Sequence, residues 1–165
     1  MPQPVYDVVC GFKYHSGPFR VVEYTANTAA LYEGGLLMLS GGKMSRWVAG
    51  NLPAGVAINY APANGKVLVS VDPETIYEAT DSLDTVTDAK IGTMCAVIAE
   101  NPSLVINRKS SMKTALFSSY TTPNTSAPVV VIGAGKGVTN NAAASNCKVL
   151  VKLITGAFEP KIDAT

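Results

Sequence analysis

The sequence predicts an all-β protein, either a β-sandwich or a β-barrel, with at most one or two short helices. Three observations lead to this prediction. Apolar residues occur in short runs that are rich in Val, Ile, Leu and Tyr, as in the strands of a packed sheet. Gly, Pro, Asn or Asp bounds most of these runs, which follow one another at about the 8–12-residue spacing of sandwiches and barrels. No long segment repeats its apolar residues with the helical period.

The segment Lys66 to Val71 shows the strand pattern most clearly. Its three valines alternate with Lys66, Leu68 and Ser70, so the valines are expected to face one side of a sheet. The segment Lys148 to Ile154 alternates in the same way. In chain order, the predicted strands are Val5 to Tyr14, Arg20 to Tyr24, Gly35 to Leu39, Arg46 to Ala49, Val56 to Tyr60, Lys66 to Val71, Ile76 to Ala79, Met94 to Ala99, Leu104 to Asn107, Val129 to Ile132 and Lys148 to Ile154.

The segments between these runs carry turn signals. Asn64-Gly65 is the strongest, because both residues tolerate the positive φ angles of a tight hairpin turn. It is expected to join the strand Val56 to Tyr60 to the strand that begins at Lys66. Gly41-Gly42 is a second turn of this kind.

Two segments are candidates for short helical turns. Ser82 to Gly92 has acidic residues near its start and a glycine at its end, as helix boundaries do. The β-branched residues at 85–87 limit it to one or two turns. Ser110 to Tyr120 is the second candidate.

The length of 165 residues and the mass of 17.2 kDa predict a single β domain over residues 19–158. Residues 1–18 are punctuated by Pro and Gly at both ends around one apolar run, and they suit an extended N-terminal arm laid on a neighbouring chain. An ordinary first strand of the domain is the alternative. Residues 159–165 form a short polar tail. The candidate partner-binding residues are Val5, Tyr6, Val8, Phe12, Tyr14 and Phe19.

The composition favours binding to other proteins. Only 15% of the residues are charged, against about a quarter in an average protein, so part of the apolar surface is expected to be buried against partners. A surface covered by Ser, Thr and Asn is the alternative. The net charge of +1 gives no general attraction to nucleic acids or acidic membranes. No signal peptide and no membrane-spanning run is visible, and Cys10, Cys95 and Cys147 lie in apolar surroundings typical of buried thiols.

The motifs that could carry chemistry are incomplete. VVVIGAGKG at residues 129–137 begins like a dinucleotide-binding fingerprint, but Val138 stands where the third glycine belongs and no helix-forming segment follows. SGGKMS at 40–45 lacks the first glycine of a phosphate loop, because Leu37 takes that position. His15 is the single histidine and forms no triad or zinc motif, and the acidic residues between Asp72 and Asp88 lack the spacing of a calcium loop. We therefore expect a protein that is not an enzyme and holds no cofactor or metal.

One segment resembles a known class of proteins. Residues 32–79 run YEGGLLMLSGGKMSRWVAGNLPAGVAINYAPANGKVLVSVDPETIYEA. This order of glycine, apolar strand, Gly-Val-Ala, glycine and alternating strand is similar to that of bacteriophage capsid decoration (cement) proteins. TDAKIGTMCAVI at residues 87–98 is similar to the element that follows in them.

The resemblance implies a homotrimer bound to the outside of an icosahedral phage head, made in the host cytoplasm and becoming part of the virion. It would clamp neighbouring subunits of the major capsid protein. Two alternatives remain open. One is a phage tail-tube or head-completion protein. The other is a carbohydrate-binding β-sandwich that uses Trp47, Tyr60 and Tyr77 as exposed aromatic residues.

Overall fold

The protein is built almost entirely of antiparallel β-strands. The computed structural model describes residues 11–81, 88–105, 107–121, 126–135 and 148–154. These residues form eleven strands and two short 3₁₀ turns and contain no α-helix, so the all-β prediction is confirmed. The strands are β1 (Lys13–Ser16), β2 (Val21–Thr25), β3 (Leu36–Ser40), β4 (Lys43–Arg46), β5 (Gly55–Ala57), β6 (Lys66–Ser70), β7 (Ile76–Thr80), β8 (Met94–Ile98), β9 (Lys113–Tyr120), β10 (Val129–Ala134) and β11 (Lys148–Leu153), and the turns are η2 (Asp88–Lys90) and η3 (Pro102–Leu104).

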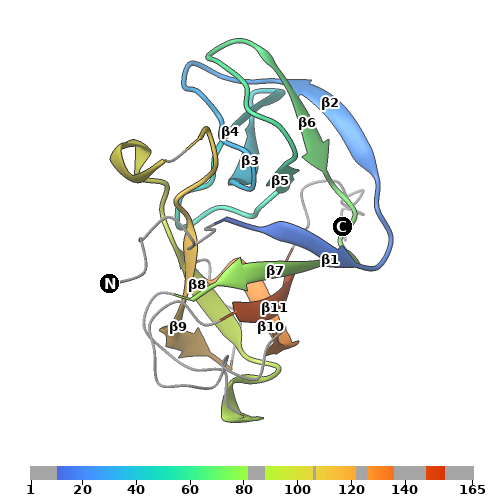
Figure 1. Cartoon of the computed structure of the whole chain (residues 1–165), viewed down its shortest axis with the longest axis vertical. Helices are drawn as coiled ribbons and strands as arrows, with labels where there is room; N and C mark the ends of the chain where they lie inside the picture. Colours follow the sequence, from blue (N-terminus) through green and yellow to red (C-terminus); the bar gives the residue numbers. More distant parts are fainter. Residues whose placement is uncertain (1–10, 82–87, 106, 122–125, 136–147, 155–165) are drawn as a thin grey trace, which may run out of the picture.

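The strands form two sheets stacked on one another (Figure 1). The large sheet has six strands in the order β1-β7-β11-β10-β8-β9, and the small sheet has five in the order β2-β6-β5-β3-β4. β1 runs between the two sheets and pairs with β7 only, so it is an edge strand of the large sheet (Figure 1).

The large sheet curves back on itself. A bridge between Asp81, just after β7, and Thr114 in β9 brings the last strand of the sheet beside β7. The Asp81 carboxylate is fully buried and accepts hydrogen bonds from the Thr114 hydroxyl, at 2.7 Å, and from the Leu116 amide, at 2.8 Å. The carboxylate thus satisfies one backbone donor and one hydroxyl donor where the large sheet closes.

The small sheet closes in the same manner. Ala26, just after β2, forms a bridge with Met44 in β4, and the Asn27 amide donates to the Met44 carbonyl at 2.8 Å. The interior of this small barrel is filled by residues with little or no exposure, many of them alanine or valine. They are Ala26, Leu31, Leu37, Met44, Ala54, Ala57, Ala61, Val67, Val69 and Val71.

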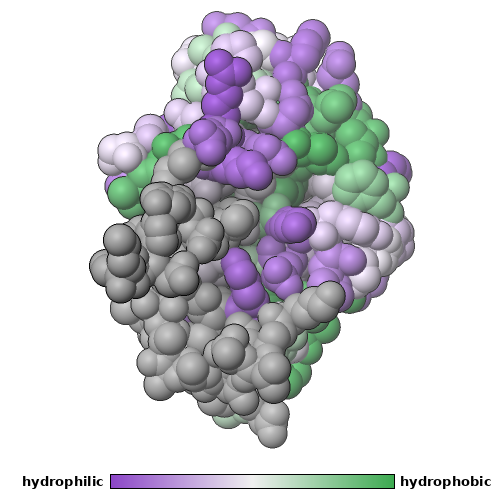
Figure 2. All heavy atoms as spheres, viewed as in Figure 1, coloured by the Kyte–Doolittle hydropathy of each residue, from purple (hydrophilic) through white to green (hydrophobic). Residues whose placement is uncertain are grey.

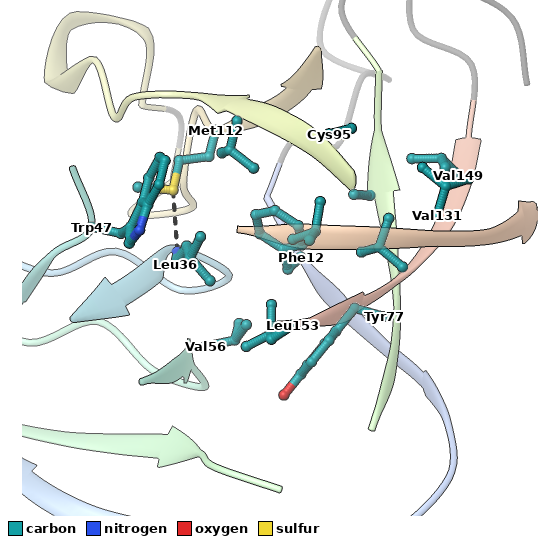
Figure 3. Packing of buried hydrophobic residues seen from close by; sticks show 14 of the residues in the cluster. Phe12, Leu36, Trp47, Val56, Tyr77, Cys95, Met112, Val131, Val149 and Leu153 are labelled. Atoms are coloured by element: carbon teal, nitrogen blue, oxygen red, sulfur yellow. Dashed lines mark hydrogen bonds between the residues drawn. The ribbon is translucent and has the colours of Figure 1, made fainter. Parts of the chain in front are cut away.

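A second hydrophobic cluster joins the two sheets. Leu36 and Val56 come from the small sheet, whereas the neighbouring residues Leu37 and Ala57 face the interior of the small barrel, as the alternation of side chains along a strand requires. The cluster also holds Trp47 and the interior of the large sheet, so the two sheets share one core (Figure 3). Its members are Phe12, Leu36, Trp47, Val56, Tyr77, Ala79, Cys95, Val97, Met112, Leu116, Val129, Val131, Val149, Val151 and Leu153.

Specific polar contacts fix how the sheets meet. The Met112 thioether accepts the Leu36 amide proton at 3.1 Å, as the dashed line in Figure 3 shows. The hydroxyl groups of Ser70 in β6 and Tyr77 in β7 lie 2.6 Å apart, and both residues are 1% exposed. This hydrogen bond links the side chains of two core strands, one from each sheet.

Most predicted strands match observed ones within two residues. Of the strand predicted at Val5 to Tyr14, residues 5–10 lie outside the described residues, and β1 begins only at Lys13 and continues to Ser16. The strand predicted at Val56 to Tyr60 is shorter than expected, because β5 ends at Ala57.

Three further predictions need correction. The strand predicted at Leu104 to Asn107 is wrong, because Pro102 and the Asn101 cap form the turn η3, and Asn107 and Arg108 have positive φ angles that end extended structure. Ser110 to Tyr120 holds the strand β9 instead of a helical turn. The strand predicted at Arg46 to Ala49 is displaced, since β4 ends at Arg46.

The predicted turns are present with one difference. Gly41 and Gly42 both have positive φ angles, of 59° and 80°, and connect the paired residues Ser40 and Lys43 as a tight two-residue hairpin. Asn64-Gly65 does lie between the paired strands β5 and β6, but only Asn64 has a positive φ. Residues 82–87 of the other predicted helical segment lie outside the described residues, and the segment's remaining part holds the turn η2.

The predicted N-terminal arm is described from residue 11 onward. In this part the chain forms β1, which pairs with β7 as a strand of the large sheet. Residues 1–10 and the predicted polar tail, 159–165, lie outside the described residues. Among the described residues there is no helix with the length and apolar character needed to cross a membrane.

The contact between Ser70 and Tyr77 generates a stability prediction. We expect Tyr77→Phe to lower the free energy of unfolding by about 1–3 kcal/mol, because the Ser70 hydroxyl stays buried and loses its partner. The double variant Ser70→Ala with Tyr77→Phe should cost less than the sum of the two single variants. Urea unfolding monitored by Trp47 fluorescence measures all three free energies. Strictly additive effects would show that the two hydroxyls do not stabilise the contact between the sheets.

Candidate functional site

A groove lies where β1 separates from the small sheet. The Phe12 amide donates to the Gly34 carbonyl at 2.8 Å, after which the chain follows β7 and leaves a gap on the side of the small sheet. The resulting cavity has a volume of about 250 Å³. Figure 2 shows apolar surface inside the hollow between the two halves of the molecule, with hydrophilic residues around it. The groove is lined by Phe12, Lys13, Tyr14, Phe19, Glu33, Gly34, Val56, Ala57, Ile58, Ser70, Tyr77 and Lys109.

The base and the rim of this groove differ in character. Buried Val56, Ala57 and the Ser70–Tyr77 hydroxyl pair belong to its lining. Burial raises the pKa of Tyr77, and the hydrogen bond with Ser70 opposes this effect, so the phenol stays protonated at neutral pH. The charged side chains of Lys13, Glu33 and Lys109 are exposed.

Two exposed aromatic residues stand beside the groove. The rings of Tyr14 and Phe19 meet edge to face with centroids 4.8 Å apart, and the Tyr14 hydroxyl donates to the Gly17 carbonyl at 2.7 Å. These contacts hold the two rings in one orientation although the side chains are 45% and 51% exposed. Fixed aromatic surface of this kind loses little conformational entropy when it is buried against a partner.

The apolar surface continues from the groove onto the small sheet. On one face of this sheet, Val21 in β2 lies opposite Ser70 in β6, which in turn lies opposite Val56 in β5. In the next row, the Ile58 amide donates to the Leu68 carbonyl, so these two residues are neighbours as well. We call the five residues Tyr14, Phe19, Val21, Ile58 and Leu68 the apolar strip.

The six sequence-predicted site residues have different positions. Val5, Tyr6 and Val8 lie outside the described residues. Phe12, which precedes β1, is 4% exposed and belongs to the shared core, whereas Tyr14 within β1 is 45% exposed. Tyr14 and Phe19 are brought together at the surface. The other members of the strip were not predicted from the sequence. One signal for Leu68 was present, because it stands between Lys66 and Ser70 on the polar side of an alternating strand.

The aromatic residues considered for carbohydrate binding form no exposed platform. Trp47 and Tyr77 are each 1% exposed, and the Trp47 indole nitrogen donates to the Asn51 carbonyl at 2.7 Å. Tyr60 is half-buried, with its ring 5.9 Å from that of Tyr32 and under the Arg108 guanidinium. All three aromatic side chains therefore serve the packing of this chain.

The glycine-rich motifs also have structural roles. The amide of Gly135 donates to the Lys148 carbonyl at 2.9 Å, and a Cβ at position 135 would lie 2.5 Å from the Cβ of Lys148. This glycine is required where β10 passes close to β11, so a Gly135→Val change tests packing and not nucleotide binding. SGGKMS forms the hairpin between β3 and β4.

Polar clusters elsewhere hold loops in place. The Glu100 carboxylate accepts hydrogen bonds from the Ser110 hydroxyl and from the amide and hydroxyl of Ser111, at 2.5 to 2.7 Å. His15 is exposed and contacts the neighbouring Ser16 hydroxyl. Within the described part of the chain, no three His, Cys, Asp or Glu residues gather as metal ligands would.

Comparison with protein-family models, curated proteins and solved structures finds no match for this chain.

The buried Cys95 generates a prediction of pH dependence. Burial raises the pKa of this fully buried thiol from an ordinary value of 9.0 to about 12. The folded state thus favours the protonated thiol, and its stability contribution is complete below pH 9 and is lost as the pH rises through about 12. A difference of three pH units corresponds to a loss of about 4 kcal/mol.

Urea unfolding between pH 8 and pH 12, at about one-unit intervals, measures this loss. We expect Cys95→Ala to be less stable than the wild type at pH 8 because of the cavity it leaves. Above pH 9 its stability should fall less steeply, since the thiol no longer contributes. Parallel pH profiles for the two proteins would contradict the prediction.

Proposed function

We propose that this protein is a bacteriophage structural protein that binds the outside of an icosahedral head. In this role it attaches, as a homotrimer, to neighbouring subunits of the major capsid protein and clamps them together. The sequence resemblance at residues 32–79 suggests this class, and the structure supports the proposal through one feature, the apolar strip.

The apolar strip has the character of a protein-binding surface. Tyr14, Phe19 and Ile58 line the groove itself. Val21 lies opposite Ser70 of the lining, and Leu68 lies between Ile58 and the exposed Glu23. Exposed apolar side chains that cluster in this way favour contact with another protein, whereas isolated ones need no explanation. Aromatic residues such as Tyr14 and Phe19 are enriched in the buried centres of interfaces.

The way in which the strip is supported also suits a clamp. Tyr14 belongs to the large sheet and Leu68 to the small sheet, and the shared core fixes the two sheets against one another. Because a trimer presents three copies of the same surface, each contact need only be modest for the whole to bind tightly.

A tail-tube or head-completion protein would use similar β-sheet surfaces, and the location of bound copies on phage particles separates these proposals. The carbohydrate-binding alternative loses its support, because Trp47 and Tyr77 are buried.

Binding to phage heads that lack the protein tests the proposal. We expect the wild type to bind such heads in a saturable manner and to raise their resistance to heat. Leu68→Asp should weaken this binding by at least about tenfold, because it places a charge in the apolar strip. Leu39→Asp is the matched control, since Leu39 is 39% exposed and Leu68 is 40% exposed, but Leu39 lies in the β3–β4 hairpin outside the strip.

Thermal unfolding of both variants shows whether the fold is retained. Failure of the wild type to bind heads, or binding to tails alone, would reject the proposed function. Equal binding by Leu68→Asp and the wild type would show that the apolar strip is not the contact surface.

A further inference from the structure

We infer that the groove between the two sheets receives the N-terminal segment Pro4 to Val9 of a second copy of this chain, with Tyr6 in the groove and Asp7 beside Lys13 and Lys109. The inference concerns association between copies and does not depend on the proposed attachment to phage heads.

The size of the groove favours a side chain as its occupant. Its volume of about 250 Å³ is below the range of roughly 300–1,000 Å³ found for small-molecule sites. Its lining includes Gly34, whose carbonyl accepts the Phe12 amide, and the Tyr14–Phe19 ring pair. Such a short apolar groove accepts one bulky side chain from an extended segment better than it accepts a helix.

The lining of the groove contains two hydroxyl groups that can bond the polar end of an incoming side chain. Ser70 and Tyr77 share one hydrogen bond between two hydroxyl groups. The Tyr77 hydroxyl also bonds Thr75, and because each hydroxyl has one donor and two acceptor positions, these bonds leave the pair with acceptor capacity. A tyrosine side chain, with an apolar ring and a terminal hydroxyl, matches apolar walls above such a base.

The charges at the rim favour an acidic segment. Lys13 and Lys109 are exposed, and neither has an acidic partner within the described residues. Glu33 is the third charged residue of the lining, so the rim carries two positive charges against one negative charge. An incoming carboxylate would therefore be attracted, and this attraction would set the orientation of the segment.

The chain itself contains a segment with this chemistry. Residues 4–9 read PVYDVV, which is one aromatic residue followed directly by one acid, with small apolar residues on both sides. Large aromatic residues that enter a pocket supply most of the energy of many protein interfaces. Asp7 is the one charged residue before Lys13.

The start of β1 favours a segment from another molecule. The amide of Gly11 donates to the Met112 carbonyl, and the amide of Phe12 donates to the Gly34 carbonyl, each at 2.8 Å. To fold back along the open edge of β1, the same chain would need a tight turn at these residues. The Phe12–Gly34 bond occupies the first position of that edge, so a tight hairpin there would have to break it.

Such a contact joins two different surfaces, a terminal segment and a groove. Contacts of this type are heterologous and produce closed rings when the rotation between copies closes. The arrangement thus offers a physical route to the trimer expected from the sequence.

Light scattering of the full-length protein over a range of concentrations, without phage heads, tests the inference. We expect concentration-dependent association of the wild type. Tyr6→Ala should weaken it by about 30-fold and Asp7→Lys by about tenfold, because the first removes the anchor and the second reverses the attraction. Combining Asp7→Lys with Lys13→Asp and Lys109→Asp exchanges the charges and should restore association. Lys43→Asp is the control: it changes an exposed lysine at the β3–β4 turn and should have no effect.

Three results would overturn the inference. The first is a wild type that stays monomeric at every concentration. The second is association that both segment variants leave unchanged. The third is that Lys13 and Lys109 are protected from acetylation in the monomer and that the Asp7→Lys variant loses this protection. Such a result would assign the groove to the chain's own segment. Loss of self-association with normal head binding, or the reverse, separates this inference from the proposed function.

Discussion

The hydrophobic cluster shared by the two sheets is the contact on which the rest of the structure depends. Leu36 and Val56 reach out of the small sheet into the interior of the large one, and Phe12 enters the same cluster from the chain before β1. Burying Phe12 there fixes the point at which the chain leaves Gly34 and begins to follow β7. The groove begins at this point, because β1 pairs with β7 and has no strand of the small sheet beside it, and Tyr14 is exposed there.

Closure of both sheets limits how the protein can contact others. Open sheet edges present unpaired backbone groups that invite pairing with any available strand. The Asp81–Thr114 and Ala26–Met44 bridges bring the outer strands of each sheet back beside their partners. Among the described strands, β1 remains as an edge of the large sheet with β7 on one side. Apart from β1, the described strands therefore present side chains more than open backbone groups, and exposed apolar side chains occur on β1, β2 and β6.

The apolar strip and the low charge content are two aspects of one property. A chain with 15% charged residues has few polar side chains with which to cover its surface. Here exposed apolar residues of β1, β2 and β6 lie in or around a groove with a net positive rim. The proposed roles in head binding and self-association assign neighbouring parts of this surface to different partners.

Some features of the fold were predictable because they depend on local properties of the chain. Alternating valines identified β6, paired glycines identified the β3–β4 hairpin, and apolar flanks identified Cys95 as a buried thiol. By contrast, β9 lacks the alternation of apolar and polar residues that identified β6. It is extended because β8 pairs with it and Asp81 binds its backbone. The strand predicted at Leu104 to Asn107 failed for the reverse reason, since local cap and turn geometry outweighed its apolar residues.

The sequence by itself determined the class of fold, the positions of most strands and the expectation of a protein-binding surface, because alternation, turn residues and composition are encoded residue by residue. Only the tertiary structure decided which aromatic residues are available. Phe12, Trp47 and Tyr77 are buried, whereas Tyr14 and Phe19 are exposed. Their side chains differ little in hydrophobic character, so their exposure depends on how the two sheets pack, which involves contacts between residues far apart in the chain.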